Sequence, residues 1–401
     1  KGSYLKTLPP SIQIVSLNNC QIVDSDVFFE SLNQVPNVEK LSLMGLQIQP
    51  PSPEVKLQLP NLKQLTFIGL YTDSLRKNHW TGIPEGLGES SQLKFLYLGN
   101  VLGETLPKGI ENLVKLESLN LSNNRLKELP DFGRLVHLKS LFLQTNQLTM
   151  LPKSIGKLVK LETLDVSANQ LSELPEGIFN LPNITRIQLN NNQLTSLPSS
   201  ITKLKNLSEL NISSNQLKEL PNKLGELTSL QTFGFAINEI SSLPTSIGQL
   251  KRLKILGMGH NPLKNLPESL GECDSLQNLQ INNCLLETLP SSIGKLKQLM
   301  FLGLTDQENY YTQSSSWSTN NQPRPQPAKY RNQLRRLPVS LVQCQKLHNI
   351  DLSQNIHWDK DFLWSFVQSF RNPNITISLR NCNLDSVPAT GWKDTQIQHF
   401  E

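Results

Sequence analysis

A period of 23 residues constrains the fold of this chain more than any other feature of its sequence. The stretch LESLNLSNNRLKELP at 116–130 returns in altered form seven more times, the last copy being LQNLQINNCLLETLP at 276–290. The shared pattern is LxxLxLxxNxLxxLPxxIxxLxx. A fixed period of this length indicates a stack of similar structural units, in which each unit contacts only its neighbours.

The pattern extends beyond these copies to fifteen units. The third apolar position of each unit falls at Leu17, Leu43, Phe67, Leu98, Leu121, Leu143, Val166, Leu189, Ile212, Phe235, Met258, Ile281, Leu304, Leu352 and Leu379. Seven consecutive spacings of 23 residues run from Leu143 to Leu304, whereas the early spacings are longer and one late spacing is 48. A regular middle with irregular ends is typical of a stacked array whose terminal units are adapted.

Each part of the repeated unit has a physical role. The LxL segment has the period of a strand, so both leucines point into the stack while the residues between them face solvent. A polar Asn follows the strand, where a buried carboxamide can satisfy backbone groups of its own and the adjacent unit. We expect this at Asn124, Asn146, Asn169, Asn192, Asn215, Asn238 and Asn261. The Pro of each LP fixes φ and starts an outer segment of short helical or 3₁₀ turns.

These repeats resemble those of the leucine-rich repeat family over nearly the whole chain. The 23-residue LPxxIxxL variety is similar to that of intracellular Ras-group proteins and many bacterial members. The resemblance implies an α/β fold, a curved horseshoe-shaped solenoid of about 15 repeats. A parallel β-sheet would line its concave face, and short helices or 3₁₀ turns would line its convex face.

The period also changes the expected domain organisation. Length alone would suggest two or three domains, but a solenoid grows by adding repeats, so we expect a single domain over 1–401. Within it we expect irregular N-terminal repeats, regular repeats, an inserted loop, C-terminal repeats and a cap or tail, at 1–100, 101–304, 305–331, 332–388 and 389–401 respectively.

The reactive residue types do not form a pattern that indicates an enzyme. Cys20, Cys284 and Cys382 occupy the Asn position of their units, which predicts buried spacers, and the five cysteines form no CxxC pair. The six histidines show no HxxxH or HExxH spacing, and no nucleotide-binding fingerprint is present. We therefore predict no catalytic residues, no cofactor and no metal.

Charge and hydropathy restrict the partners. The balance of 38 basic against 33 acidic residues gives only +5 over 401 residues, and no Lys/Arg stripe follows the strands, so we expect no nucleic acid partner. No apolar run approaches 18 residues, so we expect no membrane span. We expect a monomer. The lack of a terminal cysteine cluster favours the cytoplasm or a host-cell cytosol, with a bacterial cell surface or secretion as the alternative.

Solvent-facing strand positions and insertions carry function in such a fold. In units ten to thirteen, several solvent-facing strand positions are glycine and carry no side chain, while nearby apolar residues stay exposed. This predicts a shallow apolar trough in the sheet surface around Ile237, Ile255, His260 and Phe301. Units four to six offer a second apolar group, Phe95, Tyr97 and Phe142. The alternative is that single exposed apolar residues are normal and the glycines only relax curvature.

The 48-residue spacing marks an insertion beside the trough. About 25 extra residues separate Leu304 from NQLRRLP at 332–338, and they are too rich in Ser, Asn, Gln and Pro to form a core. The insertion nonetheless carries aromatic and basic residues, including Tyr310, Tyr311, Trp317, Lys329 and Tyr330. We hypothesise that it forms one wall of a binding site with the aromatics as anchors. The alternative is a tolerated surface insertion.

The sequence therefore favours a non-catalytic protein–protein interaction module that binds a protein or peptide on the concave sheet and the adjacent insertion. Two alternatives remain open. One is the ligand-sensing ectodomain of a bacterial surface protein or receptor. The other is the substrate-recruiting module of a larger signalling enzyme or secreted effector.

Overall fold

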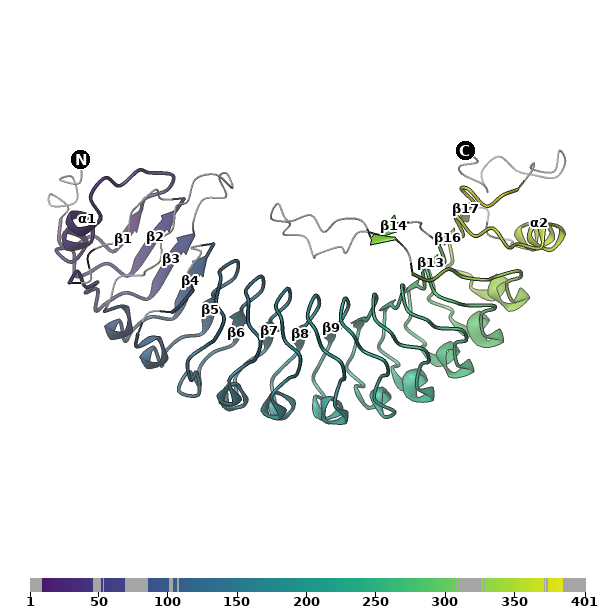
Figure 1. Cartoon of the computed structure of the whole chain (residues 1–401), viewed down its shortest axis with the longest axis horizontal. Coiled ribbons are helices and arrows are strands. Elements are labelled where there is room, and N and C mark those ends of the chain that lie inside the picture. Colours follow the sequence, from purple (N-terminus) through teal and green to yellow (C-terminus); the bar gives the residue numbers. More distant parts are fainter. Residues whose placement is uncertain are drawn as a thin grey trace. The chain divides into compact units, whose positions relative to one another are not determined.

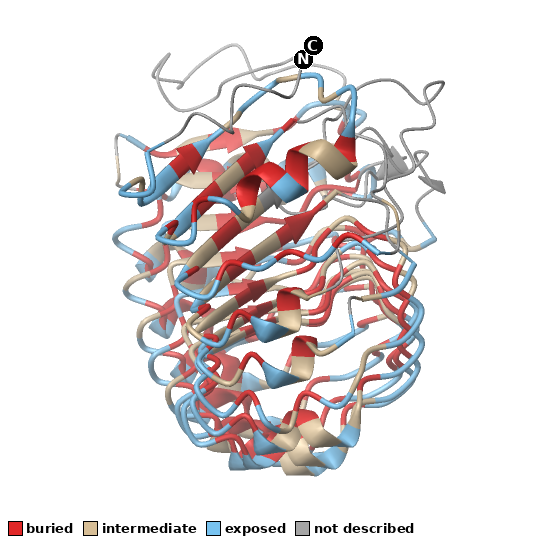
Figure 2. Cartoon of the chain, turned by 90° about the vertical axis from the view of Figure 1, so that its left-hand side faces the viewer, coloured by how far each residue is buried: buried red, intermediate tan, exposed pale blue. Residues whose placement is uncertain are grey.

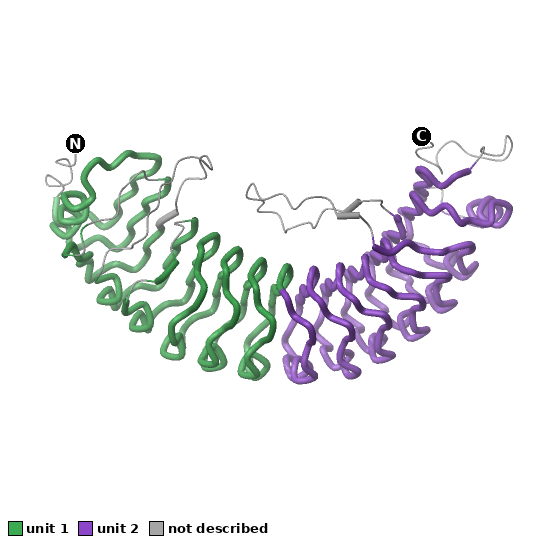
Figure 3. The backbone as a smooth tube through the Cα atoms, viewed as in Figure 1, with its two compact units in different colours: residues 1–192 green, residues 193–401 purple. Residues whose placement is uncertain are grey.

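The computed structural model describes residues 9–45, 52, 54–68, 86–100, 104–106, 108–306, 309–310, 326–327, 329–370, 372 and 374–384. The chain forms two compact units, Lys1–Asn192 and Gln193–Glu401 (Figure 3). Both are built from coils in which one short strand is followed by a turn and an outer segment (Figure 1).

The first unit holds eight strands, each hydrogen-bonded in parallel to the next. Its only α-helix among the described residues, α1 (Ser25–Leu32), begins where the Asp24 side chain accepts from the Val27 N–H at 3.0 Å. The strands are β1 (Ile14–Ser16), β2 (Lys40–Met44), β3 (Gln64–Ile68), β4 (Phe95–Gly99), β5 (Ser118–Asn120), β6 (Ser140–Phe142), β7 (Thr163–Asp165) and β8 (Arg186–Gln188).

The second unit holds seven parallel strands. They are β9 (Glu209–Asn211), β10 (Thr232–Gly234), β11 (Ile255–Gly257), β12 (Asn278–Gln280), β13 (Phe301–Gly303), β16 (Asn349–Asp351) and β17 (Thr376–Ser378). Strand β13 pairs directly with β16, and the insertion between them contributes a separate antiparallel pair, β14 (Asn309–Tyr310) and β15 (Gln326–Pro327). Eight and seven strands correspond to the fifteen units that the sequence predicts, and the α/β solenoid is confirmed.

The outer segments form 3₁₀ helices on the side of each coil opposite the strand. In the first unit they are η2 (Leu87–Glu89), η3 (Ile110–Asn112), η4 (Lys153–Lys157) and η5 (Glu176–Asn180). In the second they are η6 (Ser199–Lys203), η7 (Leu224–Glu226), η8 (Thr245–Gln249), η9 (Glu268–Glu272), η10 (Ser291–Lys295) and η11 (Val339–Gln343), followed by the α-helix α2 (Lys360–Gln368). The Pro of LP stands at the N-cap of most of these helices, for example Pro244 of η8 with φ −67°, as its fixed φ predicts.

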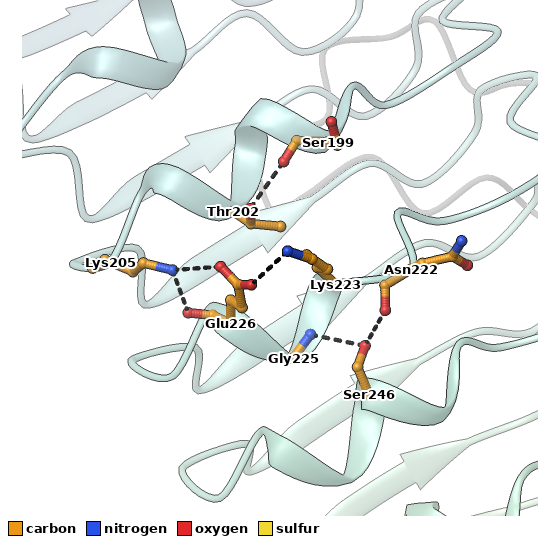
Figure 4. Close-up of polar contacts among 8 residues, drawn as sticks. All are labelled: Ser199, Thr202, Lys205, Asn222, Lys223, Gly225, Glu226 and Ser246. Carbon is orange, nitrogen blue, oxygen red and sulfur yellow. Dashed lines mark hydrogen bonds and ion pairs between the residues drawn. The ribbon is translucent and has the colours of Figure 1, made fainter.

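Neighbouring outer turns touch closely and exchange polar contacts. Figure 4 shows the Ser246 hydroxyl of η8 accepting from the Gly225 N–H at 3.1 Å and donating to the Asn222 carbonyl at 2.7 Å. Glycine is needed here, because a Cβ on Gly225 would lie 2.0 Å from the Ser246 carbonyl oxygen. An exposed ion pair from Lys205 to Glu226 at 3.0 Å joins η6 to η7 on the same side.

The core consists of the inward-facing positions of every coil. Buried residues alternate with partly exposed ones along the strands (Figure 2). Both leucines of LxL are buried, as at Leu119 and Leu121. The Asn that follows each strand forms a ladder along the stack, as predicted. Asn169 accepts from the Leu148 N–H at 3.0 Å and donates to the carbonyls of Leu143 and Val166 at 3.0 and 3.1 Å.

Two of the cysteines in the Asn position keep the donating part of this role but not the accepting part. The Cys284 thiol donates toward the Met258 carbonyl at 3.8 Å, and the Cys382 thiol donates to the Leu352 carbonyl at 3.2 Å. A thiol is a poor acceptor. An Asn at position 284 would accept from the Leu263 N–H, but with Cys there this N–H donates to the Asn261 carbonyl at 2.8 Å instead. Both thiols are buried spacers, as the repeat pattern predicts, whereas Cys20 in the first, irregular coil is only half-buried.

Candidate functional site

Two rows of side chains cover the open face of the second unit's sheet. The strand register places Thr232, Ile255, Asn278 and Phe301 in one row and Gly234, Gly257, Gln280 and Gly303 in the next. Ile255 is 42% exposed, which is unusual for a residue of its size in this sheet. The Phe301 ring lies against Gly303, where a Cβ would come within 3.0 Å of its Cε1 atom. The face therefore combines two apolar side chains with a row that is mostly glycine.

Close neighbours explain why positions 234, 259 and 303 are glycine, but no neighbour explains the glycine at 257. A Cβ on Gly234 would lie 3.1 Å from Asn211 Oδ1, and one on Gly259 would lie 2.8 Å from the Asn282 carbonyl oxygen. A Cβ on Gly257 would meet no atom within 4 Å. Glycine inside a strand lowers the stability of the folded state by about 0.5–1 kcal/mol relative to alanine. Gly257 therefore leaves open space on the sheet surface and lowers stability by about this amount.

The turns after β10 and β11 carry a second departure from local preference. In nearly every coil the residue before the ladder position has a left-handed backbone, and this residue is Asn at positions such as 123 and 191. Here it is Ile237 and His260, both at φ 57°. His adopts this conformation more readily than most residues, but a β-branched residue such as Ile237, or Thr145 at φ 59° in the first unit, is an outlier, and such strain clusters at functional sites.

The C-terminal end of the insertion lies on these turns. The Tyr330 carbonyl accepts from Asn283 Nδ2 at 3.3 Å, and Lys329 Nζ lies 3.5 Å from Glu239 Oε1 and 5.2 Å from the centre of the Tyr330 ring. Residues 329–330 are thus held against the coils of β10 to β12. This part of the insertion lies next to Ile237 and His260.

A buried carboxylate joins the two ends of the insertion. Asp306 Oδ1 accepts from the Asn332 backbone N–H at 2.9 Å and from its side-chain Nδ2 at 3.1 Å. Asn332 in turn accepts from the Leu286 N–H at 3.3 Å, the bond that identifies the ladder position. Burial raises the pKa of Asp306 to about 7. The hydrogen bonds from Asn332 and the positive charge of Arg331 lower this pKa, but their effect is smaller than that of burial.

A pocket of about 160 Å³ lies where residues 329–330 meet the turns. We call it the Ile237 pocket; it is lined by Asn215, Ile237, Asn238, Glu239, His260, Lys329 and Tyr330. Burial lowers the pKa of His260 to about 4, so its imidazole is neutral at neutral pH. A larger hollow of about 590 Å³ lies near Arg336, but its guanidinium pairs with Asp359 at 2.6 Å, so we assign no site to it.

The structure places the predicted partner-binding residues in three groups. Ile237 and His260 line the pocket, while Ile255 and Phe301 lie on the adjacent sheet face. In the first unit, Phe95 and Tyr97 on β4 and Phe142 on β6 are half-buried on the open face of the sheet, with β5 between them. Tyr310 lies in β14, whereas Tyr311 and Trp317 lie outside the described residues.

Sequence reasoning did not find Glu239 or the strain at Ile237. The signal for the strain was present in the repeat, because most other coils place Asn or another small or polar residue before the ladder position. Among the described residues no group of three or more His, Cys, Asp or Glu could hold a metal ion. None of their helices combines the length and apolar character that a membrane span requires.

Comparisons with known proteins agree with this architecture. A model of the leucine-rich repeat region matches residues 131–216, and a second leucine-rich repeat model matches residues 115–135. The leucine-rich repeat protein LIC12759 of Leptospira interrogans is 28% identical over 93% of this chain and 92% of its own, with a TM-score of 0.69. The chain is a leucine-rich repeat protein. No curated protein sequence gives a significant match.

Other leucine-rich repeat proteins are similar at lower levels. The plant peptide hormone receptor RGFR1, solved in complex with RGF2, is 26% identical, with a TM-score of 0.55, over 84% of this chain and 59% of the receptor chain. An internalin, InlF of Listeria monocytogenes, is 18% identical, with a TM-score of 0.53, over 78% of this chain and 84% of its own. The internalin shows a shared fold alone.

Replacing Ile237 by asparagine will stabilise this leucine-rich repeat protein. Asn tolerates the left-handed backbone at little cost, whereas a strained β-branched residue costs on the order of 1–3 kcal/mol. Lost burial of the half-buried isoleucine offsets part of this, so we expect a gain of about 1 kcal/mol in urea unfolding. Asn191→Ile, the reverse change in the first unit, should destabilise. A loss of stability in Ile237→Asn would contradict the assignment of strain.

Proposed function

We propose that the chain is a non-catalytic interaction module that binds a protein or peptide on the open sheet face of β10–β13 and on the edge formed by the Ile237 pocket. The observation that carries the proposal is Gly257. It opens space that no neighbour fills, near Ile237, a β-branched residue at a position where the fold requires a left-handed backbone. Departures from local rules without structural need are expected at functional sites.

The chemistry of the face suits a macromolecular partner. Ile255 and Phe301 offer apolar area one row away from the glycines, and the amides of Asn278 and Gln280 lie between them. A small apolar centre with polar groups around it is the usual anatomy of an interface. The receptor RGFR1, which shares the fold, has been solved in complex with RGF2, and this supports a peptide or protein as the partner class.

The thiols support a binding role over a covalent one. Burial raises the pKa of Cys273 and Cys284 to about 12, so neither is a thiolate at neutral pH. A thiol in this state is an inert core residue, because the thiolate is the nucleophilic form.

Filling the space at Gly257 tests the proposal. A Cβ at position 257 would meet no atom within 4 Å, so we expect the unfolding midpoint of Gly257→Trp to change little while binding at the face falls at least tenfold. Random twelve-residue peptides displayed on phage are selected with the wild-type chain, and their retention is then compared on the variant. Ser140→Trp, on the open face of β6 in the first unit, is the matched control. The proposal fails if selection yields no peptide that Gly257→Trp retains less well than Ser140→Trp does.

A further inference from the structure

We propose that the Ile237 pocket receives one uncharged, phenyl-sized aromatic side chain, Phe or Tyr, from an extended partner segment. The same segment carries a Lys or Arg about five residues away, which pairs with Asp351 on β16. This inference rests on the proposed function and deepens it, since it states which chemistry the face recognises.

The size and walls of the pocket define the first residue. Its volume is about 160 Å³, and a protein cavity of about 150 Å³ is known to take up benzene. Ile237 supplies an aliphatic wall, and the rings of His260 and Tyr330 supply aromatic walls. Aromatic rings attract one another beyond the burial of their area, so an aromatic occupant is favoured over an aliphatic one.

The floor of the pocket leaves little for a polar occupant to bind. Asn238 Oδ1 accepts from the Leu217 N–H at 3.0 Å, and its Nδ2 donates to the carbonyls of Ile212 and Phe235, both at 3.0 Å. Asn215 is engaged in the same way, accepting from the Leu194 N–H at 3.0 Å. Because these amides serve the ladder, a charged group placed over them would lose water without gaining new partners.

The charges around the pocket also disfavour a charged occupant. At the rim, the Lys329 ammonium and the Glu239 carboxylate lie 3.5 Å apart, so their fields largely cancel. Inside, the imidazole of His260 is neutral because burial lowers its pKa to about 4. An uncharged aromatic ring fits this environment, whereas a carboxylate or an ammonium does not.

Charge complementarity defines the second residue. The two rows of side chains on the open face, which begin at Thr232 and Gly234, continue across β16 and β17. Among the residues of these two rows, one is charged, Asp351. Its carboxylate accepts from the Ser353 N–H at 3.0 Å and remains partly exposed. A cation from a partner that lies across this face would find Asp351 as its counter-ion.

The geometry fixes the spacing between the two contacts. Strand β16 lies three strands from β11 in the sheet, and the His260 turn lies three residues beyond Gly257. Three strand spacings of ~4.8 Å put the two contacts at least ~14 Å apart, and the turn from Gly257 to His260 adds to this, so about five extended residues of ~3.3 Å span them.

Side-chain analogues test the pocket directly. We expect p-cresol to give saturation-transfer NMR signals with the wild-type protein and n-butylammonium to give none. The dissociation constant of p-cresol should rise at least tenfold in Ile237→Asn and in Tyr330→Ala. Ile237→Asn is expected to be more stable than the wild type, so lost binding there would not reflect unfolding. Equal binding of the two analogues, or p-cresol binding unchanged in both variants, would overturn the assignment.

Designed peptides test the pairing with Asp351. Twelve-residue peptides carry one Tyr and one Arg separated by three to seven positions, in both orders. We expect affinity to peak near a separation of five and to fall about tenfold in Asp351→Asn for that peptide but not for its Arg→Ala version. Asp165→Asn is the control, because Asp165 in the first unit accepts from the Ser167 N–H at 3.0 Å in the same way.

The results separate the two proposals. If phage peptides are lost on Gly257→Trp but show neither an aromatic nor a basic preference, the interaction face stands and the inference about its chemistry falls. If Gly257→Trp retains every selected peptide while p-cresol still occupies the pocket, the proposed function falls and the pocket remains a small-ligand site. An equal response of the Tyr–Arg peptides to Asp351→Asn and Asp165→Asn would remove the basic residue from the inference.

Discussion

Asp306→Asn will remove a loss of stability that we expect between about pH 4 and pH 7. Burial raises the pKa of Asp306 from its ordinary 3.8 to about 7. Below pH 3.8 the carboxyl group is neutral in both the folded and the unfolded chain. As the pH rises, the unfolded chain releases this proton first, while the folded chain keeps it until about pH 7. The contribution of Asp306 to the free energy of unfolding therefore falls across this range and is constant above it.

The asparagine variant carries no titrating proton but retains an oxygen that can accept from the Asn332 N–H. At pH 8 it should therefore be more stable than the wild type, by an amount on the order of 3 kcal/mol. Urea unfolding at pH values from 4 to 8 measures this. A variant that keeps the decline of stability toward pH 7 would show that another group is responsible.

His260 contributes a slope of the opposite sign, which offsets most of that of Asp306 between about pH 4 and 6.5, so the net decline in the wild type is concentrated near pH 6.5 to 7. Burial lowers the pKa of His260 from 6.5 to about 4. Above pH 6.5 the ring is neutral in both states. As the pH falls toward 4, the unfolded chain takes up a proton that the folded chain does not, so stability is lost. His260→Asn should remove this acid-side loss and leave the Asp306 slope, and Asp306→Asn should do the reverse.

Asn169→Ala will destabilise the protein by about 3 kcal/mol, because it leaves the Leu148 N–H buried without its acceptor and removes one donor from each of three carbonyls. Those carbonyls keep a second donor, since Asn146 also bonds the Leu143 oxygen, Asn192 the Val166 oxygen and the Thr145 N–H the Ser167 oxygen. The loss is therefore concentrated at Leu148. Urea unfolding measured at one pH gives the difference.

Asn169→Cys is the informative control for this prediction. A thiol can donate to a carbonyl of the preceding coil, as Cys382 does to Leu352 at 3.2 Å, but it is a poor acceptor for the Leu148 N–H. We therefore expect a cost between those of wild type and alanine. If cysteine and alanine cost the same, donation to the carbonyls contributes nothing, and the ladder acts only through its accepting oxygen.

Much of the fold was predictable because the same residue types, with the same local preferences, recur at the same positions of each repeat. The alternation in LxL specifies the strand, the fixed φ of proline starts the outer turn, and the polar Asn serves the backbone that the turn leaves unpaired. These requirements are met between neighbours 23 residues apart, so the pattern of one period is enough to define them. The chain divides into two compact units, and the single-domain organisation over 1–401 stays a prediction.

The candidate site was predictable only in part. Exposed apolar positions and glycines on the strands identified Ile255, Phe301 and the turns at Ile237 and His260. Composition also indicated a wall in the insertion. Composition gave no indication of which of its residues would reach the turns, because contacts across 90 residues, such as that between Lys329 and Glu239, depend on how the insertion ends.

The sequence by itself determined the repeat, its fifteen strands and the buried ladder, because all of these arise from contacts between adjacent units. Only the tertiary structure decided that Gly257 is free of packing while Gly259 is not, that Ile237 sits in a strained backbone, and that Asp306 joins the ends of the insertion. These depend on distances between atoms from different coils and on the exclusion of water, which no local pattern specifies.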